Sequence, residues 1–163
     1  MATFGYTTHS TDFTASIHNY LCGTIFTCPD GSAVVSKITC YVNMTGAYVI
    51  VKCAIYNATD PSNPTLVAST EQKIFDDLGE DNPPVANGWY DFNFASPPTL
   101  AAGDYMLVGW GQKVGANDVV QMVGSTTSTN PLYAQSLTYS GTFPDPMVET
   151  HVADWKNSIY ATY

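Results

Sequence analysis

The sequence predicts an all-β protein, a two-sheet antiparallel β-sandwich built as a single domain over residues 1–163. Three observations support this prediction. Hydrophobic residues alternate with a period of two and not of 3.6. Turn-forming clusters recur roughly every ten residues, and no segment shows a helical pattern longer than a turn or two. A chain of 163 residues buries about two-thirds of its surface around one core, so one domain suffices.

Two neighbouring runs show the clearest alternation. In residues 36–44, one face holds Ile38, Cys40 and Val42, and the other holds Lys37, Thr39 and Tyr41. In residues 48–57, one face holds Val49, Val51, Cys53 and Ile55, and the other holds Tyr48, Ile50, Lys52 and Tyr56. β-branched and aromatic residues dominate both runs, as a half-buried pleated surface favours. Gly46 between the runs can adopt a positive φ, so we expect a β-hairpin here.

The remaining strands are expected in shorter runs. They cover residues 22–28, 65–70, 71–75, 89–94, 104–110, 118–123 and 158–163. In the run 89–94, Trp89, Asp91 and Asn93 share one face. The run 104–110 is apolar on both faces, which predicts a central strand covered on both sides. The link over residues 96–103 is too short and too rich in proline for a helix, so we expect a loop across one end of the sandwich.

The segments "KCAIY", "PTLVAST" and "GWYDFNFASPPTLAAGDYMLVGWG" together resemble a jelly-roll β-sandwich module. Such modules occur as carbohydrate-binding-like accessory domains of secreted multidomain proteins and in viral and metagenomic structural proteins. The resemblance covers about residues 22–111, with a looser echo at 158–163. It implies a jelly-roll fold. The matching residues are mainly packing and turn residues, so it implies no catalytic residue.

The charge of the chain limits its partners. The net charge is −9, and the chain has five lysines and no arginine. Nucleic-acid binding needs cationic side chains to replace the counterions of phosphate, so we exclude it. An anionic membrane surface is disfavoured for the same reason, and no apolar run is long enough for membrane insertion. Neutral ligands such as sugars, divalent cations, or copies of the same chain remain as partners.

Composition and the start of the chain bear on localisation. Charged residues are only 12% of the chain, and serine, threonine and asparagine provide most of the polar surface. Such a surface is typical of extracellular, virion or surface-associated β-proteins. The first residues lack the basic and apolar regions of a signal peptide.

Motifs of known enzymes are missing from the sequence. It contains no GxSxG elbow, no HExxH and no phosphate-binding loop. Glu149, His151 and Asp154 lie close together in sequence, and a carboxylate–histidine pair can act as a general base or ligate a metal. We favour a solvated loop for these three residues and predict that the protein is not an enzyme.

An acidic segment at residues 75–84 predicts a calcium site. Its carboxylates are Asp76, Asp77, Glu80 and Asp81, and the amide of Asn82 follows. Calcium takes six to eight oxygen ligands, which such a loop and its carbonyl groups can supply. The spacing differs from that of an EF-hand, and an exposed acidic turn is the alternative.

Aromatic residues are the second candidate for ligand contact, because exposed rings stack on the C–H faces of sugars. The candidates are Trp110, Trp155, Tyr133, Tyr139 and Trp89. Tryptophan also caps sandwich cores, and we expect a core position for Trp89. Trp110 lies where a strand meets a loop, and the sequence leaves open whether it belongs to the core or borders a ligand loop. Trp155 lies in a stretch rich in proline and polar residues, so exposure is expected there. We therefore predict a non-catalytic carbohydrate-binding module. In the alternative, a structural or assembly protein, the same aromatics form a subunit interface.

The four cysteines are expected to be buried free thiols. Cys22 and Cys28 share one strand and lie about 20 Å apart if it is extended, too far for a disulfide. Cys40 and Cys53 lie on adjacent expected strands as diagonal neighbours. The sequence leaves open whether these two are bonded.

Overall fold

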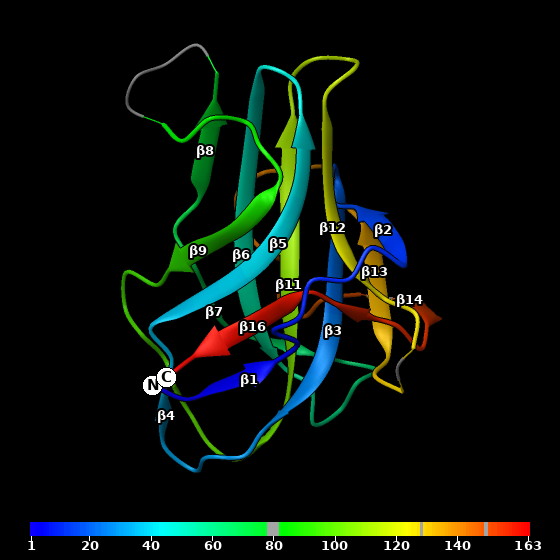
Figure 1. The fold of residues 1–163 in the computed structure, drawn as a ribbon. Helices are drawn as coiled ribbons and strands as arrows, with labels where there is room; N and C mark the ends of the chain where they lie inside the picture. Colours follow the sequence, from blue (N-terminus) through cyan, green and yellow to red (C-terminus); the bar gives the residue numbers. More distant parts are fainter. Residues whose placement is uncertain (78–81, 128, 149) are drawn as a thin grey trace.

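The computed structural model describes residues 1–77, 82–127, 129–148 and 150–163. Over these residues the regular structure is entirely β, with no helix, and every ladder between strands is antiparallel (Figure 1). The predicted all-β antiparallel fold is confirmed. Within the described ranges no helix is long and apolar enough to cross a membrane.

The strands form two seven-stranded sheets and one short ribbon. Sheet A contains β1 (Thr3–Gly5), β2 (Phe13–Ser16), β5 (Lys37–Thr45), β9 (Gly88–Asn93), β12 (Val119–Ser125), β15 (Lys156–Asn157) and β16 (Ile159–Thr162). Sheet B contains β3 (Tyr20–Cys28), β6 (Tyr48–Asn57), β7 (Thr65–Ser69), β8 (Lys73–Asp76), β11 (Gly103–Lys113), β13 (Leu132–Ser136) and β14 (Thr150–Ala153). The ribbon joins β4 (Ala33–Val34) and β10 (Thr99–Leu100).

The main core lies between the two sheets, and both contribute to it. From sheet A come the inner residues of β5, namely Ile38, Cys40, Val42 and Met44. From sheet B come Val49, Val51, Cys53 and Ile55 of β6. The alternation in the sequence therefore identified the face of each strand that points into this core. Two sheets that share one core give a sandwich-like arrangement of layers.

The predicted hairpin between these two strands is wrong. β5 belongs to sheet A and β6 to sheet B, so the chain crosses the sandwich at the turn where Gly46 has a φ of 113°. A tight turn alone does not determine whether two strands pair side by side or face each other. Here β5 takes its partners from distant segments, namely β9, β12 and β16. Cys40 and Cys53 consequently face each other across the core and are not diagonal neighbours in one sheet.

The central position predicted for residues 104–110 is confirmed. β11 lies between β3 and β6, and its middle seven residues are buried. The preceding loop connects β9 of sheet A with β11 of sheet B, as expected for a link across one end of the sandwich.

A second apolar cluster covers the outer face of sheet B. Residues 137–147, here called the strap, place Leu137, Tyr139, Phe143 and Met147 against Leu21, Tyr56, Met106 and Trp110 of the sheet. Three donors hold the backbone of the strap: Trp110 Nε1 to Leu137 O (3.2 Å), Lys52 Nζ to Gly141 O (2.8 Å) and Tyr56 Oη to Pro144 O (2.7 Å). Sheet B is therefore covered on both faces.

Candidate functional site

The outer face of sheet A carries a row of side chains that the alternation sends away from the core. On β5 these are Lys37, Thr39 and Tyr41; on β9 they are Trp89 and Asp91; on β16 it is Tyr160. We call these six residues the outer-face cluster. All are half-buried except Thr39, which is buried.

Strand register brings the cluster together from three distant parts of the chain. Tyr41 pairs with Trp89 across the β5–β9 ladder, and Thr39 pairs with Asp91 in the same ladder. On the other side of β5, Thr39 pairs with Tyr160 of β16. β5 is therefore the central strand of the cluster, and side chains from β9 and β16 reach over it.

The ring of Trp89 contacts those of both Tyr41 and Tyr160. The ring of Trp89 meets that of Tyr41 edge to face, with centroids 5.6 Å apart and an interplanar angle of 89°. The centroid of Tyr160 also lies 5.6 Å from that of Trp89. The exposed imidazole of His9 stacks on Tyr41 at a centroid distance of 4.0 Å. Such mutual contacts fix ring positions and make an ordered aromatic surface.

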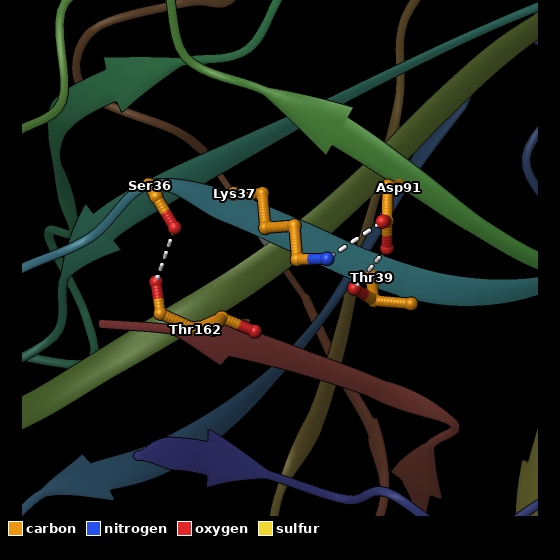
Figure 2. A network of polar contacts seen from close by, with 5 residues as sticks. All are labelled: Ser36, Lys37, Thr39, Asp91 and Thr162. Atoms are coloured by element: carbon orange, nitrogen blue, oxygen red, sulfur yellow. Dashed lines mark hydrogen bonds and ion pairs between the residues drawn. The ribbon is translucent and has the colours of Figure 1, made fainter. Parts of the chain in front are cut away.

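A polar group adjoins the rings and is drawn in Figure 2. Asp91 accepts two short hydrogen bonds, one from Lys37 Nζ at Oδ2 and one from Thr39 Oγ1 at Oδ1, each 2.6 Å long. Nearby, the Ser36 hydroxyl donates to the carbonyl of Thr162 on β16 (3.2 Å). The ammonium and carboxylate neutralise each other, so the cluster offers charged hydrogen-bonding groups without a net charge from this pair.

These contacts set the ionisation of Asp91. Partial burial acts to raise its pKa. The hydrogen bonds from Lys37 and Thr39, with the charges of Lys37 and Lys73, outweigh burial and hold the pKa below its ordinary value. Asp91 is therefore a carboxylate near neutral pH.

Of the predicted aromatic site residues, Trp89 belongs to this cluster and Trp110 does not. The expected core position for Trp89 is wrong, because its side chain lies half-buried on the outer face of sheet A. Of the two positions left open for Trp110, the structure shows the core one, because the side chain is fully buried beneath Tyr139 and Phe143 of the strap. A buried indole presents no face to a ligand, so we withdraw Trp110 as a contact residue.

The other three predicted aromatics lie apart from the outer-face cluster. Trp155 is half-buried and packs on Phe13 of β2, with ring centroids 4.9 Å apart. Tyr133 on β13 and Tyr139 in the strap are half-buried around the second apolar cluster. Burial raises the pKa of Tyr139 to about 12. The structure does not bring these three residues together with Trp89.

The acidic segment is only partly described. Asp76 ends β8, and Asp77 Oδ1 accepts a hydrogen bond from the backbone of Val85 (2.7 Å). Glu80 and Asp81 lie outside the described residues, as does Glu149 of the other predicted carboxylate group. Among the described residues no group of three or more His, Cys, Asp or Glu is placed to share a metal ion. The calcium site stays a prediction.

The sequence alone did not identify five residues of the cluster as site residues: Tyr160, Lys37, Thr39, Tyr41 and Asp91. The alternation had already placed Lys37 with Tyr41, and Trp89 with Asp91, on shared faces. The sequence does not show that β5 pairs with β9 and with β16. These pairings bring the face with Lys37 and Tyr41 and the face with Trp89 and Asp91 together on the outside of sheet A.

Comparison of the chain with protein-family models, with curated proteins and with solved structures finds no match. Any function must therefore be inferred from the geometry of the outer-face cluster.

Proposed function

We propose that this chain is a non-catalytic module that binds carbohydrate on the outer-face cluster. One observation carries the proposal: three contacting, half-buried rings lie beside a paired carboxylate and ammonium on one sheet face. Binding sites for small polar ligands combine aromatic side chains with a few placed polar groups in the same way.

The chemistry of the cluster suits an uncharged sugar. The rings of Trp89, Tyr41 and Tyr160 offer apolar surface to the C–H groups of a pyranose. The ammonium of Lys37 can donate to hydroxyl oxygens, and the carboxylate of Asp91 can accept from hydroxyl hydrogens. A net charge of −9 disfavours anionic polysaccharides at long range. We therefore infer a neutral polysaccharide, and an extracellular or surface-associated setting in which such ligands occur.

We also propose a jelly-roll connection of the sheets. Three pairings support it because they are nested along the chain: β3 with β13, β5 with β12, and β6 with β11. Nesting of this kind arises when one long antiparallel hairpin folds over to form both sheets.

Affinity gel electrophoresis tests the binding function. Hydroxyethyl cellulose, xylan, galactomannan and glycogen are cast separately into native gels. We expect at least one of them to retard the wild type, and Trp89→Ala to reduce that affinity at least about tenfold, a loss of 1.4 kcal/mol. Trp155→Ala is the matched control, because Trp155 is another half-buried indole that packs elsewhere. Absence of retardation in every gel, or equal loss in both variants, contradicts the proposal.

A second candidate function is assembly with copies of the same chain. The two outermost strands of sheet B each carry an exposed valine, Val67 on β7 and Val152 on β14. Edge strands with exposed apolar side chains are suited to pairing with another chain. Light scattering at high concentration distinguishes the two functions: a defined oligomer that Val152→Lys dissociates favours assembly, and a monomer contradicts it.

A further inference from the structure

We infer that Cys40 and Cys53 form a disulfide across the sandwich when the chain folds in the presence of a disulfide oxidant such as oxidised glutathione. The inference is independent of the proposed carbohydrate site. It begins from one distance: the two Sγ atoms lie 3.9 Å apart in the reduced protein, both with no exposed surface.

The two cysteines hold equivalent places in the sandwich. Cys40 is on β5, between β9 and β16 of sheet A. Cys53 is on β6, paired with Gly109 of β11 in sheet B. Each side chain points into the core that the two sheets share. A bond between them would join two inner strands of opposite sheets.

The backbone around Cys53 is held firmly. Thr70 Oγ1 accepts from the amide of Cys53 at 3.0 Å and donates to its carbonyl at 3.1 Å, and the Thr70 amide also donates to that carbonyl. Since a disulfide bond is about 2.05 Å long, the sulfurs must approach by about 2 Å. Rotation about the Cα–Cβ bonds and small shifts of the sheets are the available movements.

The chemistry proceeds by two exchanges. The thiolate of one cysteine attacks oxidised glutathione, forms a mixed disulfide and releases one glutathione thiolate. The thiolate of the second cysteine attacks the mixed disulfide, forms the Cys40–Cys53 bond and releases a second glutathione. The protein loses two protons and two electrons, which one oxidised glutathione takes up to become two reduced molecules.

The folded, reduced protein is expected to react slowly. Burial raises the pKa of Cys53, and the adjacent Cys40 thiol raises it further. A raised pKa leaves little thiolate, and burial keeps the oxidant away from both sulfurs. Oxidation therefore takes place during folding, while the oxidant can still reach the sulfurs of Cys40 and Cys53.

The other two cysteines differ in their surroundings. Cys22 Sγ lies 3.4 Å from the carbonyl oxygen of Ser16, and Cys28 Sγ lies 3.7 Å from that of Asp30. Each is a buried thiol beside a backbone acceptor. These residues supply matched control variants for the experiment.

The positions of the lysines make the bond easy to detect. Trypsin cleaves after Lys37, Lys52 and Lys73, so Cys40 falls in peptide 38–52 and Cys53 in peptide 53–73. Cys22 and Cys28 both fall in peptide 1–37. A Cys40–Cys53 disulfide therefore joins two separate peptides, and a Cys22–Cys28 bond would stay within one.

The experiment is refolding from urea in a mixture of reduced and oxidised glutathione, followed by alkylation, digestion and mass spectrometry. We expect peptides 38–52 and 53–73 to be joined, with Cys22 and Cys28 alkylated. We also expect the oxidised protein to melt roughly 6–12 °C above its reduced form, because the bond closes a short loop in the unfolded chain. Cys40→Ala and Cys53→Ala should abolish both effects, whereas Cys22→Ala and Cys28→Ala should keep them.

Two results overturn the inference. One is four alkylated cysteines after refolding across a range of glutathione ratios. The other is a disulfide that includes Cys22 or Cys28 as the main product. The double variant Cys40→Ala,Cys53→Ala is the control for misfolding. If this variant and the wild type both refold and the wild type stays fully reduced, the two thiols met in the folded protein and did not bond.

Discussion

Tyr41 of β5 and Trp89 of β9 are register partners in sheet A, and their rings meet edge to face with centroids 5.6 Å apart. Trp89 also contacts Tyr160 of β16, which lies on the other side of β5. An aromatic surface held by three strands is ordered before any ligand arrives. Binding to it avoids much of the entropy cost of fixing flexible side chains.

The Tyr41 ring, and not its hydroxyl, is expected to matter for ligand binding. Tyr41→Phe keeps the contacts with Trp89 and His9, so we expect its affinity for the retarding polysaccharide to stay within about twofold of wild type. Tyr41→Ala removes the ring that supports Trp89, and we expect at least about a tenfold loss. Affinity electrophoresis measures both variants. Equal losses in the two would show that the hydroxyl, and not the ring, carries the effect.

Asp91 is expected to make stability depend on pH in acid. The contacts with Lys37 and Thr39 hold its folded-state pKa below the unfolded value of about 3.9. The stabilisation is therefore present above that unfolded value and is lost as the pH falls through the lower folded-state value. The Asp91 side chain is 46% exposed, so solvent screening keeps the effect small.

Urea unfolding at a series of pH values checks this prediction. Between pH 5 and pH 2, the wild type should lose slightly more stability than Asp91→Asn, which has no charge to lose. The two proteins should converge at the acid end of the range. A wild type that gains stability relative to Asp91→Asn on acidification contradicts the assignment.

Trp110 is expected to act through stability and not through ligand contact. Trp110→Ala removes a fully buried side chain and the hydrogen bond to Leu137 O, so we expect a loss of about 3–5 kcal/mol in the free energy of unfolding. Hydrogen exchange should show faster opening of the strap. Polysaccharide affinity of the remaining folded protein should not change. Loss of affinity at unchanged stability would contradict this role.

The sequence predicted best those properties that depend on a single strand or turn and not on its partners. The alternation around Cys40 and Cys53 identified the inner face of β5 and β6, and the apolar run at residues 104–110 identified a strand covered on both sides. Gly46 was correctly expected at a positive φ. Each of these properties depends on local periodicity or backbone sterics.

Errors arose where the outcome depends on which distant segments meet. The turn at Gly46 is compatible with a hairpin and with a crossing between sheets. The crossing forms because β5 pairs with β9, β12 and β16 and not with β6. The position of Trp110 could not be decided from the sequence because the strap that covers it comes from residues 137–147. Tyr160 was missed because its neighbours are fixed by the register of β16 on β5.

Calcium is expected to stabilise the protein if the acidic segment binds it. Addition of calcium at millimolar concentration should then raise the melting temperature, and a chelator should reverse the rise. Asp76→Asn is the variant and Asp60→Asn the control, because Asp60 lies in a different turn, where its carboxylate accepts from the Ser62 amide (3.0 Å). A melting temperature unaffected by calcium and chelator contradicts the predicted site.

A side chain at Gly46 is expected to destabilise the protein for two separate reasons. Its φ of 113° disfavours any residue with a Cβ, and a Cβ at this position would lie 1.9 Å from Asp118 Oδ1. Asp118 is itself held, since its Oδ2 accepts from the Gly115 amide at 2.7 Å. We expect Gly46→Ala to lower the free energy of unfolding by roughly 1–3 kcal/mol. Gly31→Ala is the control: its Cβ would meet nothing within 4 Å, so urea unfolding should show little change. Because this turn carries the chain from β5 to β6, equal stability of the two variants would mean that the crossing between sheets is not built as described.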